Sequence, residues 1–141
     1  MDMVDVLELL TPRQTLVYNE LITPKTYAQI QRQLSLSSGG VRCHVNKVLE
    51  KTESSSRVDL LCDYYAQNDA YVLRDLDFIK TLDDLETSVF TFTINGYSIQ
   101  ETADALGMSR STVRFARHRI YLKSQAEGVL DLVHKCYGVL Q

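Results

Sequence analysis

The chain has 141 residues, 45% of them hydrophobic, which is enough for one ordinary domain or two small ones with packed cores. No apolar run is long enough to span a membrane, and the N-terminal segment is acidic, which counts against a secretory signal and indicates a cytoplasmic protein. The formal net charge of −3 counts against a uniformly basic nucleic-acid binder.

Helical patterns begin near residue 10. Thr11 is placed to cap a helix whose first residue is Pro12, and Thr23-Pro24-Lys25 interrupts the pattern. Two further helices are predicted on either side of a tight turn, and a fourth from about Arg57 to Tyr65. The apolar stripes of the first three helices are Leu16, Val17 and Leu21; Tyr27, Ile30 and Leu34; and Val41, Val45 and Val48.

Gly39 and Gly40 fall in the first turn of the helix that carries Val41. Each glycine costs about 1 kcal/mol relative to alanine inside a helix, so this helix is expected to fray at its start. Alternatively, the two glycines let a phosphate approach the backbone closely. We favour the first interpretation, in which the destabilised helix binds its ligand only weakly.

Residues 66–81 connect the two halves of the chain and contain neither Gly nor Pro. Their large apolar residues are Tyr71, Val72, Leu76, Phe78 and Ile79. This composition is not that of a flexible tether. We therefore predict a short helix that packs on one or both halves.

The clearest pattern lies in residues 98–123. Ser98 and Glu101 form a predicted capping box for a short helix. Gly107 is suited to the left-handed end of that helix, and Ser109 can cap the next one. The apolar face of the first helix consists of Ile99, Ala103 and Leu106. Residues 98–123 thus predict two helices joined by a tight turn.

The second of these two helices has two distinct sides. On a helical wheel, its buried side is Val113, Ala116 and Ile120. The opposite side carries Ser111, Arg114, Phe115 and His118, flanked by Arg110 and Arg119. Residues 110–123 contain five Lys or Arg and no acid, whereas acidic residues crowd the middle of the chain. The local field of this helix is therefore positive although the chain is acidic.

Shifting the sequence by 72 residues aligns its two halves without a gap. Leu10 meets Leu82, Val41 meets Val113 and Lys51 meets Lys123. The counterpart of the basic side in the first half is Arg42, Cys43 and Asn46, with Lys47 at its flank. The last helix of the second half is predicted from about Glu127 to Tyr137, with an apolar stripe of Val129, Leu130, Val133 and Tyr137. Two copies of one module are the economical explanation.

At these residues the sequence resembles the LuxR/GerE-type helix-turn-helix family, and it is also similar to region 4 of bacterial sigma factors. The matching residues of the second half are Ser98, Glu101, Ala103, Leu106, Gly107, Ser109, Thr112, Val113, Ile120 and Lys123. The first half matches the family's opening with Leu10-Thr11-Pro12-Arg13 and has His44 at the family's histidine position. The second half departs from the family at Thr102 and Ala116.

The resemblance implies an all-α protein of two tandem four-helix modules joined by a packed linker. The first module covers residues 1–65, with an N-terminal extension, the linker residues 66–81 and the second module residues 82–141. In the family, residues just after the Thr-Val pair enter the major groove, which carries over to Arg114, Phe115 and His118. The family's last helix serves dimerisation. The resemblance therefore allows two arrangements through the fourth helices, a homodimer or an internal pseudo-dimer, and does not choose between them.

The predicted function is a sequence-specific, double-stranded DNA-binding transcription regulator without a sensory domain, of bacterial or phage type. Arg114 is expected to pair with guanine, Phe115 to touch a thymine methyl and Asn46 to read adenine. The phosphate contacts are expected from Ser109, Arg110, Arg119 and Lys47. The alternative is a protein-binding regulator that uses the same fold to contact RNA polymerase, a sigma factor or another transcription factor.

No catalytic or cofactor-binding motif is visible, so we expect neither an enzyme nor a cofactor. His44, His118 and His134 are far apart and accompany no nucleophile motif. The three cysteines lack the spacing of metal ligands and are interpreted as reduced thiols. No metal site is therefore predicted.

Overall fold

The computed structural model describes residues 8–139 and divides into two compact units, Met1–Gln67 and Asn68–Gln141. Within the described residues, the regular structure is α-helical except for a two-stranded ribbon and one short 3-10 helix. This confirms the predicted all-α class. Residues 1–7, on which most of the predicted N-terminal extension falls, lie outside the described residues.

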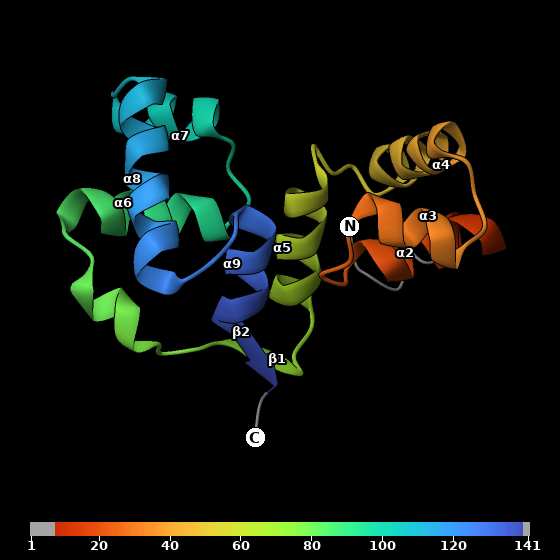
Figure 1. Ribbon diagram of the computed structural model, residues 1–141, viewed down its shortest axis with the longest axis horizontal. Coiled ribbons are helices and arrows are strands. Elements are labelled where there is room, and N and C mark those ends of the chain that lie inside the picture. Colours follow the sequence, from red (N-terminus) through yellow and green to blue (C-terminus); the bar gives the residue numbers. More distant parts are fainter. Residues whose placement is uncertain (1–7, 140–141) are drawn as a thin grey trace. The chain divides into compact units, whose positions relative to one another are not determined.

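The first unit contains helices α2 (Pro12–Leu21), α3 (Tyr27–Gln33), α4 (Ser38–Lys51) and α5 (Arg57–Gln67), the orange to yellow helices of Figure 1. Its core consists of Leu10, Val17, Tyr18, Leu21, Ile30, Val41, Val45, Val48 and Leu60. Leu16 and Tyr27 were expected on apolar faces but are about half exposed, at 49% and 47%. The buried side of α2 instead runs from Gln14 through Val17 to Leu21, which turns Leu16 towards solvent.

The second unit contains β1 (Tyr71–Leu73), the 3-10 helix η1 (Asp77–Thr81), α6 (Asp84–Ile94), α7 (Ile99–Leu106), α8 (Arg110–Ser124), α9 (Val129–Cys136) and β2 (Tyr137–Val139). Helix α8 packs against α6, α7 and η1, and α6 also contacts α9. The buried core consists of Val89, Phe90, Ile94, Ala103, Val113, Ala116, Ile120, Leu132 and Cys136.

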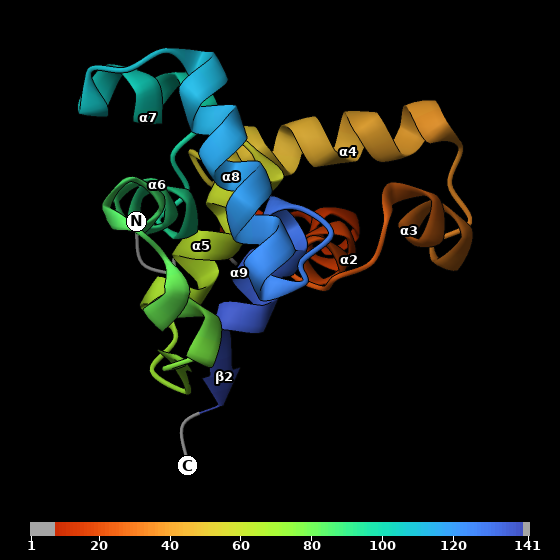
Figure 2. The same ribbon diagram turned by 60° about the vertical axis from the view of Figure 1, so that its left-hand side comes forward.

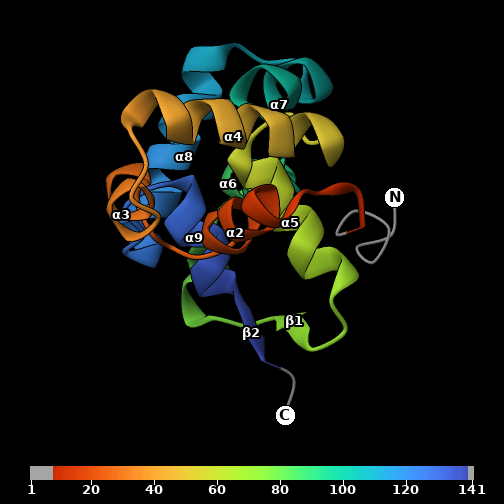
Figure 3. The same cartoon turned by 90° about the vertical axis from the view of Figure 1, so that its right-hand side faces the viewer.

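The segment predicted as a helical linker has a different structure. Strand β1 pairs antiparallel with β2, with Tyr71 opposite Val139. Figure 3 shows the two strands at the lower end of the second unit. The helix predicted over 127–137 correspondingly ends at Cys136, and Tyr137 begins the partner strand. Aromatic and β-branched residues favour strands, and here each strand finds a partner far along the chain. The prediction of a helix was therefore wrong for residues 71–73.

Residues after β1 belong to the core of the second unit. Leu76, Phe78 and Ile79 pack on its buried cluster, and the Phe78 ring meets the Phe90 ring edge to face with centroids 5.7 Å apart. Such a pair contributes about 0.5–1.5 kcal/mol beyond the area it buries. The predicted packing of this segment is thus found, with η1 as the packed element.

Both units repeat one geometry at the spacing of 72 residues. The helices of the first unit begin at residues 12, 27, 38 and 57, and those of the second at 84, 99, 110 and 129. The caps coincide as well, because Thr11 and Asp83 each accept the backbone N–H of the third helical residue. Left-handed residues also correspond: Gly107 (φ 66°) matches Ser35 (φ 54°). The first unit therefore forms the same turn without the glycine that adopts it most cheaply.

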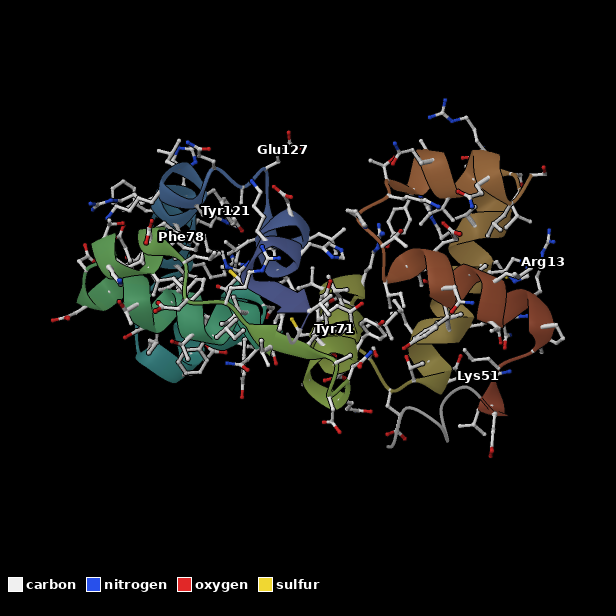
Figure 4. The ribbon with its side chains drawn as sticks, turned by 90° about the horizontal axis from the view of Figure 1, so that it is seen from below. Arg13, Lys51, Tyr71, Phe78, Tyr121 and Glu127 are labelled. Carbon is white, nitrogen blue, oxygen red and sulfur yellow. The ribbon has the colours of Figure 1, made fainter. Side chains whose placement is uncertain are left out.

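In each module, a lysine near the end of the third helix binds residues at the start of the first helix. Lys51 Nζ, labelled in Figure 4, donates to Gln14 Oε1 at 2.7 Å and to the Leu9 carbonyl at 3.2 Å. Lys123 Nζ donates to Glu86 Oε1 at 2.7 Å and to the Thr81 carbonyl at 2.9 Å. The long helix of each module is thereby held to the start of its first helix.

In the second module the lysine binds a carboxylate, Glu86, where the first module has the neutral Gln14. The Glu86 side chain is only 1% exposed. Burial raises the pKa of its carboxyl. The hydrogen bonds from the Asp83 backbone N–H and Lys123, together with the nearby charges of Arg119 and Lys123, outweigh that effect, so the net pKa lies below its ordinary value. A carboxyl with a lowered folded-state pKa stabilises the fold above its unfolded pKa, and this contribution is lost as pH falls through the folded pKa.

Replacing Glu86 by Gln should therefore weaken the acid sensitivity of the second unit. The variant reproduces the Gln14–Lys51 pair of the first unit and should lose less stability than the wild type between pH 7 and pH 3, values that lie on either side of the ordinary Glu pKa of about 4.3. Urea titrations followed by circular dichroism at both pH values measure this difference. Equal losses for wild type and variant would show that other carboxyls dominate acid unfolding.

Candidate nucleic-acid interface

Helices α7 and α8 form a helix-turn-helix in the second unit, where Figure 2 shows them next to each other. The Ser98 hydroxyl accepts the Glu101 N–H at 3.1 Å, and the Glu101 carboxylate accepts the Ser98 N–H at 3.0 Å. Gly107 then adopts the left-handed conformation, and Ser109 caps α8 by accepting the Thr112 N–H at 3.1 Å. The predicted capping box, turn and second cap are all present.

The two sides of α8 separate as the wheel predicts. Val113, Ala116 and Ile120 are at most 1% exposed and face the core. The predicted contact residues on this helix and its cap are all exposed: Ser109, Arg110, Ser111, Arg114, Phe115, His118 and Arg119. Phe115 is 60% exposed, which is unusual for a phenylalanine and leaves its ring available to a ligand. The core thus fixes the orientation of a basic surface that contains an aromatic ring.

Arg117 belongs to the basic stretch of the sequence but not to this surface. It is 8% exposed; its Nε donates to the Thr93 hydroxyl at 3.1 Å and one Nη donates to the Tyr97 carbonyl at 2.7 Å. Burial lowers the pKa of its guanidinium, an effect that the interaction with Tyr121 partly offsets. The wheel angle of Arg117, about 40° from Val113, was the sequence signal for this structural role.

Arg119 is exposed but engaged within the module. Its Nε lies 3.3 Å from Glu86 Oε2, one Nη lies 4.0 Å from an Asp83 carboxylate oxygen, and its Cζ lies 5.7 Å from the centroid of the Phe115 ring. Part of its charge is therefore offset before any ligand binds. The sequence placed Arg119 among the phosphate contacts without showing these partners, because both carboxylates are more than 30 positions away along the chain.

The first unit presents a similar but less basic surface on α4. Arg42, Cys43, Asn46 and Lys47 are all exposed, opposite the buried Val41, Val45 and Val48. The two surfaces lie in different units, so each is a candidate interface of its own.

The glycine pair lies within the regular part of α4, which begins at Ser38 and is capped by the Ser37 hydroxyl. A Cβ at Gly39 would meet no atom within 4 Å, whereas one at Gly40 would lie 3.1 Å from the Ser37 hydroxyl oxygen. A side chain at Gly40 would therefore crowd the Ser37 cap. At Gly39, no atom of the module excludes a side chain.

A pocket of about 400 Å³ opens beside this surface of the first unit. It is lined by Tyr27, Gln31, Ser38, Val41, Arg42, Val45, Asn46, Leu49, Ser56 and Arg57. Arg57 is anchored there, since its Nε donates to the Leu21 carbonyl at 2.9 Å and one Nη to the Thr23 carbonyl at 2.8 Å. Neither the pocket nor this anchoring was apparent in the sequence.

No group of His, Cys, Asp or Glu side chains that could hold a metal ion occurs among residues 8–139. None of the helices in this part of the chain is long and apolar enough to cross a membrane.

Comparison with protein families gives a match for each half of the chain. Residues 8–63 match the family of bacterial regulatory proteins of the luxR type, and residues 76–123 match region 4 of sigma-70. No curated protein and no solved structure was found to match. Both matched families are regulatory rather than enzymatic, which confirms the prediction that the protein is not an enzyme. The chain therefore carries two tandem helix-turn-helix modules, the first similar to the luxR family and the second to region 4 of sigma-70, and is of the type of a DNA-binding transcription regulator.

Proposed function

We propose that the protein binds specific double-stranded DNA sequences, with α8 as its main reading helix. The observation that carries this proposal is the exposed side of α8, where three charged or aromatic side chains, Arg114, Phe115 and His118, lie opposite a fully buried apolar side. An α-helix held in this way fits the major groove, and its exposed side chains can reach base edges. A cytoplasmic location is part of the same proposal.

The side chains divide into base readers and phosphate contacts. Arg114 is suited to bidentate pairing with guanine and Phe115 to contact with a thymine methyl. Ser109 and Arg110, at the start of α8, are suited to phosphate because the N-terminus of a helix favours anions. Arg119 is a weaker candidate for phosphate than the sequence indicates, because it already pairs with Glu86.

In the first module, Asn46 is placed to read adenine and Lys47 to hold a phosphate. Position 47 corresponds to Arg119 of the second module, but Gln14 stands where Glu86 stands there. Lys47 therefore lacks the carboxylate that offsets Arg119. We infer that α4 contributes phosphate binding and weaker base reading.

The direct test is a selection from random duplex DNA with the full chain, followed by titration of the enriched duplex at several salt concentrations. We expect one enriched motif whose binding weakens steeply with salt, because phosphate contacts release counterions. Absence of any enriched motif at low salt would refute the proposal of sequence-specific binding.

A second candidate function is binding to a protein such as RNA polymerase or another regulator. It is favoured by Phe115 and Leu122, which are 60% and 66% exposed and lie seven residues apart, on the same side of α8. An apolar contact of this kind should respond little to salt, so the same titration separates the two functions. Self-association through α5 or α9 remains a prediction, which analytical ultracentrifugation can test.

Cys43 provides a native probe of the first module. It is exposed on the proposed DNA-facing side of α4, whereas Cys62 and Cys136 are buried and burial raises the pKa of their thiols to about 12 and about 11. Because the thiolate is the reactive form, a maleimide at pH 7 should label Cys43 far faster than the other two cysteines.

Addition of the selected duplex should slow the labelling of Cys43 about tenfold or more if α4 lies on DNA, because bound DNA excludes the reagent. Mass spectrometry of the labelled peptides measures the rate. A duplex of unrelated sequence at the same salt concentration is the control. Unchanged labelling at saturating selected DNA would assign DNA binding to the second module alone.

A further inference from the structure

The pocket of the first module lies between α3, α4 and the start of α5, and its lining differs in chemistry from the corresponding positions of the second module. Val45 and Leu49 line it, and the corresponding residues of the second module are Arg117 and Tyr121. There the Arg117 guanidinium donates hydrogen bonds to the Thr93 hydroxyl and the Tyr97 carbonyl. The first module has smaller apolar side chains at both positions, and these form part of the pocket wall.

In the first module, a different arginine makes the hydrogen bonds to backbone carbonyls. Arg57, the first residue of α5, donates to the carbonyls of Leu21 and Thr23 near the end of α2, and its Cζ lies 5.2 Å from the centroid of the Tyr27 ring. Its guanidinium is therefore held at the wall of the pocket in a fixed orientation. A preorganised guanidinium loses less entropy on binding an anion than a free side chain does.

The lining divides into an apolar part and a polar part. Val41, Val45 and Leu49 from α4 supply the apolar surface. The polar part holds two arginines, Arg42 and Arg57, together with amide and hydroxyl side chains, and none of the described residues that line the pocket is an Asp or Glu. The volume of about 400 Å³ falls in the range of roughly 300–1,000 Å³ typical of small-molecule sites.

We propose that this pocket binds a small carboxylate with an apolar or aromatic body. The body lies on Val41, Val45 and Leu49, and the carboxylate accepts charge-assisted hydrogen bonds from Arg42 and from the Nη donors of Arg57 that do not bind the Leu21 and Thr23 carbonyls. The lining includes Arg42 and Asn46, which face DNA in the proposed function. The regulatory consequence therefore rests on that function: the bound carboxylate withdraws the first module from DNA.

The binding step is tested without DNA. The probe is 3-phenylpropionate, compared with its neutral amide, titrated into the ¹³C-methyl-labelled full chain. We expect shifts of the Val41, Val45 and Leu49 methyl signals and binding of the acid at least about fivefold tighter than the amide, because charge-assisted hydrogen bonds are roughly twice as strong as neutral ones. Absence of these shifts up to the solubility limit of the acid overturns the proposal.

Three variants sharpen this test. Arg57→Gln should remove the preference for the acid over the amide, and Leu49→Tyr, which introduces the residue of the second module, should weaken binding of both probes about tenfold or more by filling the pocket. Arg13→Gln, an exposed arginine of the same module that does not line the pocket, is the control and should leave the binding of both probes unchanged. Unchanged binding by Leu49→Tyr overturns the proposal even if Arg57→Gln fails to fold.

The regulatory step uses the selected duplex. The probe acid should weaken DNA binding and restore maleimide labelling of Cys43 in the wild type, but it should do neither in Leu49→Tyr. If the acid binds but DNA binding and Cys43 labelling do not change, the regulatory step is refuted and the pocket stands. If the chain binds no DNA at all, the methyl titration still decides on the pocket.

Discussion

Replacing Arg117 by Ala is expected to lower the free energy of unfolding of the second unit by about 2–4 kcal/mol. The substitution removes the hydrogen bonds to the Thr93 hydroxyl and the Tyr97 carbonyl and leaves unfilled space beside buried residues. Amide hydrogen exchange measured by NMR is the suitable method, because it reports on each unit separately. A loss below about 1 kcal/mol would show that water replaces the guanidinium at little cost.

A double substitution tests the reason for this loss. Thr93→Leu combined with Arg117→Val introduces the apolar pair that the first unit has at Leu21 and Val45. We expect the double variant to recover to within about 1 kcal/mol of the wild type, because replacing a buried polar pair by apolar residues of suitable shape is often nearly neutral. Losses that simply add would mean that the two residues act independently.

Replacing Arg114 by Ala is expected to weaken binding to the selected duplex about 10- to 100-fold, because one good bidentate contact to a base contributes about 1–3 kcal/mol of discrimination. Binding to unrelated DNA should change far less. The matched substitution Arg42→Ala, at the same position of the other module, should have a smaller effect on specificity. Fluorescence anisotropy at fixed salt concentration measures all three proteins.

An equal loss on all DNA sequences would mean that Arg114 contacts the backbone instead of a base. A loss of similar size for Arg42→Ala, with two half-sites in the selected motif, would indicate that both modules read sequence. The first result would contradict the role proposed for Arg114, and the second the weaker role proposed for α4.

The features that the sequence predicted correctly are those that local patterns determine. The Ser98–Glu101 box, the left-handed Gly107 and the Ser109 cap each depend on a few neighbouring residues, so their chemistry can be read directly. The repeat of 72 residues added the domain pattern, because two matching sets of caps and stripes are hard to explain otherwise. The exposed side of α8 followed from helical periodicity alone.

The features that the sequence did not reveal depend on contacts between distant residues. Strand β1 forms because residues 137–139 lie beside it, and nothing within residues 66–81 indicates that partner. Likewise, the wheel angle places Arg117 near the buried side of α8, but its partners Thr93 and Tyr97 cannot be read from the sequence around it. The basic residues of α8 look alike in the sequence, but their partners within the module determine which of them are free to contact a ligand.

The different cores of the two modules also bear on how the chain avoids misassembly while it folds. Chains with similar tandem modules are prone to exchange equivalent helices, because the incoming helix finds much the same surroundings. If α8 docked on α2 in place of α4, the Arg117 guanidinium would face the apolar Leu21 instead of the Thr93 hydroxyl. An unpaired buried charge of this kind is strongly unfavourable. The Arg117–Thr93 pair therefore disfavours the exchanged arrangement relative to the one in which α8 packs on α6.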